Sequence, residues 1–78
     1  MRDAADYQYA CYQTLGERHP TLLAHIRQRI SSRGSEQDVL LSCVPLISSA
    51  TDDTTVLSTI VPAAVAYMIA CRARGEQF

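Results

Sequence analysis

The stretch from Val39 to Cys71 constrains the fold more than any other part of the chain. Its charged residues are the adjacent Asp52 and Asp53, whereas most of the arginines lie upstream. A short soluble chain must cover such an apolar stretch with its own remainder, with a second copy or with a partner protein. The layout therefore predicts a helical hairpin that needs covering, and it indicates binding rather than catalysis.

The length and the net charge set further bounds. The chain has 78 residues and a formal charge of −1, so we expect a single helical domain over residues 1–78 with no overall attraction to nucleic acid or membrane. A domain of this size buries only about 60% of the surface of its unfolded chain. Small domains often gain stability by oligomerising, and we therefore predict a homodimer.

The apolar spacing predicts an all-α fold, a compact bundle of four short helices, or of five if Pro62 divides the last one. We expect the first helix from about Asp3 to Leu15, with Gly16 just past its end. Four residues would share its inner face: Ala4, Tyr7, Cys11 and Leu15.

The second predicted helix begins at Pro20 or Thr21, runs to about Ser32, and is ended by Gly34. This segment has the clearest amphipathic pattern in the chain, because its apolar residues recur at spacings of three and four. Its expected buried stripe consists of Leu22, Leu23, Ile26 and Ile30.

The third predicted helix begins after Ser35, whose hydroxyl suits an N-cap, with Asp38 three residues later. Pro45 would kink this helix or end it near Cys43. Apolar residues surround its axis on nearly every side, so we expect a core helix that is buried all round.

A fourth predicted helix is capped by Thr51 or Asp52, reaches about Arg74, and is stopped by Gly75. Pro62 would kink it or divide it. Its apolar stripe is wider than one buried face, so we expect this helix to supply a contact surface. The expected surface lies around Val65, Tyr67 and Ile69.

No catalytic, cofactor-binding or metal-binding residue is predicted, and we expect the protein not to be an enzyme. The chain has three cysteines, an odd number, and they lack the close spacing of metal ligands: Cys11, Cys43 and Cys71. Their apolar surroundings predict buried, reduced and unreactive thiols. Asp52 and Asp53 are explained as acids of a first helical turn. The glycines stand singly, so there is no phosphate-binding loop.

Four arginines (Arg18, Arg27, Arg29 and Arg33) fall within sixteen residues that contain no acid. This basic face allows an alternative function, a helical module that binds nucleic acid along its phosphate backbone. The following helix would then be the recognition helix, yet it opens with two acids and continues as an apolar run. We therefore favour an arginine patch that docks on an acidic protein.

A second alternative is a small membrane-associated helical hairpin. Residues 54–71 carry no charge and approach the length of about 18 residues that spans a bilayer. Ser58, Thr59, Pro62 and several alanines dilute the hydrophobicity of this segment. The first residues lack the pattern of a secretion signal, so a cytoplasmic location is expected.

The tyrosines indicate where a partner would bind. Tyr9 lies outside the expected core face of the first helix, and tyrosine is common at interfaces because it buries a large ring and keeps a polar group. The alternative is that the rings close the edges of a small core. We predict a cytoplasmic, non-enzymatic regulator or inhibitor of a bacterial or phage source that binds another protein. Its candidate interface residues are Tyr9, Tyr12, Arg27, Arg29, Val65, Tyr67 and Ile69.

Overall fold

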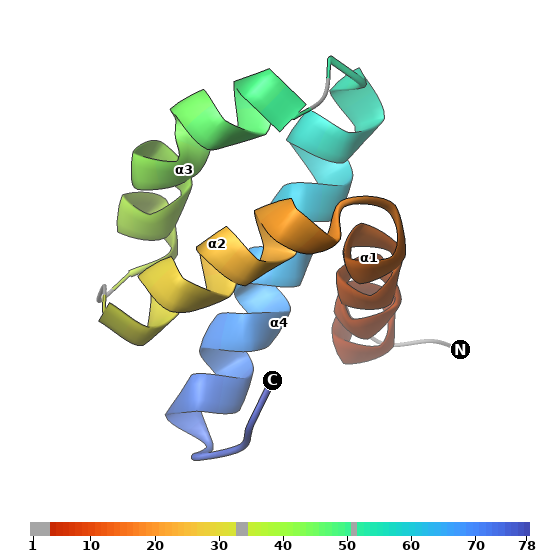
Figure 1. Ribbon diagram of the computed structural model, residues 1–78. Coiled ribbons are helices and arrows are strands. Elements are labelled where there is room, and N and C mark those ends of the chain that lie inside the picture. The colour runs from red at the N-terminus through yellow and green to blue at the C-terminus, as the bar shows by residue number, and fades with distance from the viewer. Residues whose placement is uncertain (1–3, 33–34, 51) are drawn as a thin grey trace.

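Helices make up nearly all of the fold in a computed structural model that describes residues 4–32, 35–50 and 52–78 (Figure 1). In chain order the elements are α1 (Ala4–Arg18), α2 (Pro20–Ser32), α3 (Glu36–Ala50), a π-helical segment η1 (Val56–Ile60) and α4 (Val61–Ala73), which continues η1 without a break. The described ranges contain no strand. The all-α prediction is confirmed.

The centre of the bundle is α4, which packs against α1, α2 and α3. In Figure 1 it runs between α1 and α3, and α2 crosses it. From Val61 to Arg72 no residue is exposed. The prediction that the fourth helix is the outer contact surface is therefore wrong, because this helix is surrounded by the other three. Its wide apolar stripe serves several intramolecular contacts.

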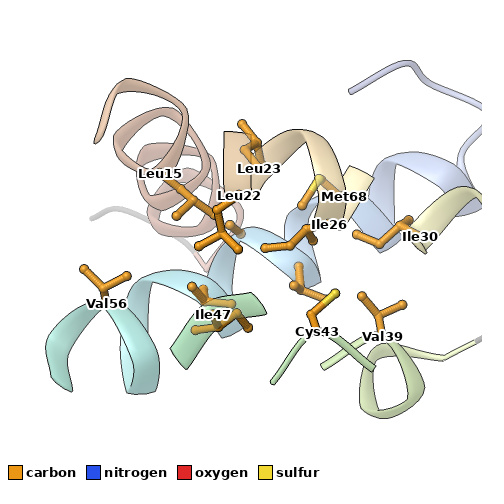
Figure 2. Packing of buried hydrophobic residues seen from close by; sticks show 13 residues of the cluster. Leu15, Leu22, Leu23, Ile26, Ile30, Val39, Cys43, Ile47, Val56 and Met68 are labelled. Atoms are coloured by element: carbon orange, nitrogen blue, oxygen red, sulfur yellow. The ribbon is translucent and has the colours of Figure 1, made fainter. Parts of the chain in front are cut away.

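Every helix contributes to one apolar core (Figure 2). The predicted stripe of α2 is confirmed, since all four of its residues are buried, with Ile26 and Ile30 completely so. Cys11 and Leu15 of α1 are buried as predicted, whereas Tyr7 is half exposed. The remaining core residues come from α3, η1 and α4: Val39, Cys43, Ile47, Val56, Val61, Ala64, Val65 and Met68.

One side of α3 is buried and the other is exposed. Val39, Cys43 and Ile47 face the core, while Leu41 is 64% exposed and Val44 is 50% exposed. The helix lies at the edge of the bundle, where it packs against α2 and α4. The prediction of a third helix buried all round is thus wrong, because its neighbours cover one face alone.

Gly16 lies inside α1 and does not end it, contrary to the predicted boundary. The helix continues to Arg18, and the amide of His19 donates to the carbonyl of Leu15. A Cβ atom on Gly16 would lie 3.1 Å from Cδ2 of Leu23. The glycine therefore permits the close approach of α1 and α2.

The helix ends are capped by local hydrogen bonds. The amide of Asp38 donates to Oγ of Ser35 at 3.2 Å, which confirms the predicted N-cap of α3. The cap before η1 is Asp53, whose Oδ1 accepts from the amide of Thr55 at 2.9 Å. The predicted cap at Asp52 is therefore wrong by one residue. The other two predicted helix-end residues, Thr51 and Gly34, lie outside the described residues.

At the end of α4, Gly75 has a positive φ of 75°. The amide of Glu76 donates to the carbonyl of Cys71 at 2.8 Å, and that of Gly75 donates to the carbonyl of Arg72 at 3.1 Å. This pair of bonds is a Schellman motif, which favours glycine at the left-handed position. The predicted stop at Gly75 is confirmed.

Both internal prolines are accommodated without ending a helix. The helix α3 continues through Pro45, and its ribbon bends along its length (Figure 1). Pro62 follows η1, in which the amide of Val61 donates to the carbonyl of Val56, five residues back. Because proline has no amide hydrogen, a widened turn before it relieves the hydrogen-bond mismatch and the clash of its ring. The last two elements therefore form one continuous, irregular helix.

Candidate protein-interaction surfaces

Three of the predicted interface residues form an aromatic cluster between α1 and α4. The ring centroid of Tyr67 lies 5.3 Å from that of Tyr9 and 4.9 Å from that of Tyr12, with tilted planes. Tyr9 is 45% exposed and its hydroxyl accepts a hydrogen bond from Nε2 of Gln13. The rings therefore close the edge of the core between two helices, which was the alternative explanation of these tyrosines, and Tyr9 also keeps a surface open to solvent.

The hydroxyl of Tyr67 is held in its neutral form. A hydrogen bond with the side chain of Cys71, one turn later, raises the pKa of Tyr67 to about 12, and burial and the neighbouring tyrosines act in the same direction. A hydrogen bond with Cys11 likewise raises the pKa of Tyr7. Both pairs tie a tyrosine to a buried cysteine on its own helix.

Val65 and Ile69 do not lie on an open surface. Val65 is completely buried, and Ile69 is half-buried and packs against the core. Val65 is thus a core residue. Most of the surface predicted around Val65, Tyr67 and Ile69 is buried in contacts within the chain.

The two predicted interface arginines lie on α2. Arg27 is exposed, and its Nη2 donates to the main-chain oxygen of Phe78, so it ties α2 to the segment after α4. Arg29 is half-buried. Arg18 lies in the last turn of α1, and Arg33 lies outside the described residues. Arg27 therefore combines an exposed position with a structural contact to the segment after α4.

An apolar groove that was not predicted from the sequence lies between α3 and the start of the last helix. It has a volume of about 320 Å³, and Ser48 is the one polar residue among those that line it within the described part of the chain. The sequence did signal it, because the third helix carries more apolar residues than one buried face needs. The lining residues are Leu40, Val44, Ile47, Ser48, Leu57, Val61 and Pro62.

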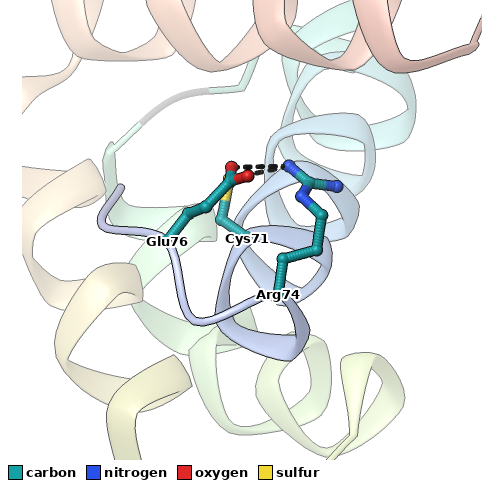
Figure 3. A network of polar contacts seen from close by, with 3 residues as sticks. All are labelled: Cys71, Arg74 and Glu76. Carbon is teal, nitrogen blue, oxygen red and sulfur yellow. Dashed lines mark hydrogen bonds and ion pairs between the residues drawn. The ribbon is translucent and has the colours of Figure 1, made fainter.

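The polar contacts after α4 have a local role. Arg74 forms an ion pair with Glu76 at 3.0 Å, and its Nη2 also contacts Sγ of Cys71 at 3.6 Å (Figure 3). The hydrogen bond and the charge of Arg74 lower the pKa of Glu76. These contacts hold the turn that follows the helix.

Two features bear on the alternative kinds of site. Across residues 4–32, 35–50 and 52–78, no group of three or more His, Cys, Asp or Glu side chains converges as a metal site would require. The segment Val56–Ala73 has a mean hydropathy of 1.7 and is long and apolar enough to cross a membrane. Here that segment forms the central helix of the bundle, and a core position also accounts for its hydropathy.

Comparison of the chain with protein-family models, with curated proteins and with solved structures found no match.

Proposed function

We propose that this chain is a non-enzymatic protein-interaction module, a small regulator or inhibitor that acts by covering a surface of another protein. The observation that supports it most directly is the exposure of Leu41 and Val44, at 64% and 50%, on the outer side of α3, where Val44 also lines the apolar groove. These residues lie three apart and are neighbours on the outer side of α3.

The exposed position of these side chains leaves binding energy available. Full burial of a leucine or valine side chain contributes about 1.5–3 kcal/mol. Leu41 and Val44 gain only part of this within the folded chain, because half or more of their surface stays in water. A partner that excludes this water would gain the remaining burial free energy on binding. For this reason, contiguous exposed apolar residues often mark interaction sites.

The proposal is tested by capture from cells of the source organism. The bait variants are the wild type, the double variant Leu41→Asn with Val44→Thr, and the control Tyr7→Gln, which removes a side chain that is also 50% exposed but lies on α1. We expect a protein that binds the wild type and the control and is lost with the double variant. Identical proteins on all three baits would contradict the proposal.

Homodimerisation stays a prediction. It is measured in the same preparations by sedimentation at micromolar concentration, and a mass of one protomer would contradict it.

A further inference from the structure

We propose that the groove between α3 and the last helix binds a basic amphipathic helix of the partner protein. This inference rests on the proposed function and adds the chemistry of the partner. It follows from the groove's apolar lining, from the distribution of charge around it and from the hydrogen-bonding needs of whatever fills it.

The charged residues in the stretch that forms the groove walls have one sign. From Ser35 to Cys71, the stretch that supplies both walls, the sequence contains no lysine, arginine or histidine. Its four charged residues are acidic, and all four are exposed in the structure: Glu36, Asp38, Asp52 and Asp53.

Two of these acids lie toward the two ends of the groove. Glu36 precedes Leu40 by four residues and Val44 by eight, so these three share one row along α3. At the other end, the carbonyl of Asp53 accepts a hydrogen bond from the amide of Leu57 at 3.0 Å, which places Asp53 one turn before a lining residue. An occupant would thus meet an apolar floor and negative charge at both ends, and positive flanking side chains complement this pattern.

The walls of the groove favour a helical occupant. Both are helices, whose main-chain groups are largely bonded within the helix. An extended peptide would find few main-chain partners and would leave its own amides unsatisfied on an apolar floor. A helix satisfies its main chain internally and presents an apolar stripe at spacings of three and four. The lining residues of α3 run from Leu40 to Ser48, so the apolar stripe of the partner helix should extend over about 14 Å.

A second copy of this chain fits the groove less well. Two copies paired through α3 would bring the acidic residues of one against those of the other, with no basic residue from 35 to 71 to offset them. The basic amphipathic segment of the chain itself is α2, yet Ile26 and Ile30 on its apolar stripe are completely buried in the core. A folded copy therefore offers no free basic amphipathic helix.

Synthetic helices provide the test. The first probe is a labelled 16-residue peptide with a leucine stripe at helical spacing and lysines at its other positions. The second has the same stripe with glutamates, and the third has the lysine composition in an order that destroys the stripe. Fluorescence anisotropy at low and high salt measures the binding of each probe to the full chain.

Four variants locate the binding. Glu36→Gln with Asp52→Asn removes two acids near the groove and leaves the Asp53 cap intact, while Asp6→Asn with Glu17→Gln removes two acids of α1 as a charge-matched control. Leu41→Asn with Val44→Thr removes the exposed apolar face of α3, of which Val44 lines the groove, and Tyr7→Gln is its control. Thermal unfolding confirms that each variant is folded.

We expect the lysine helix to bind at least about tenfold more tightly than the glutamate helix and the scrambled peptide. The groove acid variant should lose about three- to tenfold in affinity and part of the salt dependence, and the control should lose neither. The apolar variant should lose about tenfold or more.

Equal binding of the lysine and glutamate helices would overturn the inference about charge. Failure of every probe, when cellular capture still depends on Leu41 and Val44, would overturn the basic helix and leave the proposed function standing. A dimer of the chain that the apolar variant dissociates would make the second copy the occupant. Failure of both the probes and the capture would contradict the inference and the proposed function together.

Discussion

Arg72 donates from Nη1 to the carbonyl oxygen of Ile30 at 2.6 Å, which joins the end of the central helix to the last turn of α2. The last four carbonyls of a helix have no intrahelical partner, and a cationic donor there satisfies one of them and complements the negative end of the helix dipole. The contact spans 42 residues of sequence. It fixes α2 on the C-terminal end of α4. Asp53 caps the opposite end of the same continuous helix.

Replacing Arg72 by alanine should lower the free energy of unfolding by about 1–2 kcal/mol, because a hydrogen bond from a charged donor is lost. Arg74→Ala is the matched control, since its ion pair with Glu76 is exposed and water screens the attraction between the two charges. Urea denaturation measures both. Equal losses in the two variants would show that the Arg72 contact does not stabilise the bundle.

The stability should fall at alkaline pH through Tyr67. Its pKa is about 10 in an unfolded chain and is raised to about 12 in the fold. The unfolded state therefore loses its proton first, so this contribution is fully present below about pH 10 and is lost as the pH rises toward 12. Tyr67→Phe has no such proton to lose.

Urea midpoints between pH 9 and 12 should thus fall more steeply for the wild type than for Tyr67→Phe. The pKa of Tyr7 is also raised, but its side chain is half exposed, so Tyr7→Phe should change the slope less than Tyr67→Phe does. Parallel curves for the wild type and Tyr67→Phe would remove Tyr67 from the explanation.

Two valines of α3 test which side of that helix faces the core. Val39 is completely buried and Val44 is 50% exposed. We expect Val39→Ala to cost about 1.5–3 kcal/mol of folding free energy and Val44→Ala at most about 0.5 kcal/mol. Thermal and chemical denaturation give both values, and the reverse order would mean that α3 is rotated about its axis.

Gly16 should tolerate no branched side chain, because a Cβ alone would lie 3.1 Å from Cδ2 of Leu23. Gly16→Val is expected to destabilise by about 1–3 kcal/mol through overpacking. In combination with Leu23→Ala, which clears the space, the cost of the valine should shrink. Strict additivity of the two changes in a double-mutant cycle would contradict the close contact.

The parts of the fold that depend on local pattern could be predicted from the sequence. The amphipathic stripe of α2 gives its position and its buried face, since three- and four-residue spacing has one helical solution. Ser35 and Gly75 mark helix ends through capping geometry that a few neighbouring residues determine. These predictions required no knowledge of how the helices pack.

The assignment of inner and outer helices depends on packing and was not available from local pattern. The third and fourth helices are both strongly apolar, and their sequence patterns predicted the third in the core and the fourth at the surface. The structure reverses them, since the small residues of α4, such as Ala63 and Ala64, let three helices approach it closely while Leu41 stays in water. The helix end predicted at Gly16 was wrong for the same reason, because the sequence does not distinguish a glycine at a helix crossing from a glycine at a helix end.

The central claim, that the outer face of α3 binds another protein, is tested most directly by the affinity of one captured partner for two forms of this chain. Isothermal titration of that purified partner with the wild type and with Leu41→Asn and Val44→Thr gives the two dissociation constants. The claim predicts that the double variant, with its thermal stability retained, binds at least about tenfold more weakly. Equal dissociation constants for the two folded proteins would contradict it.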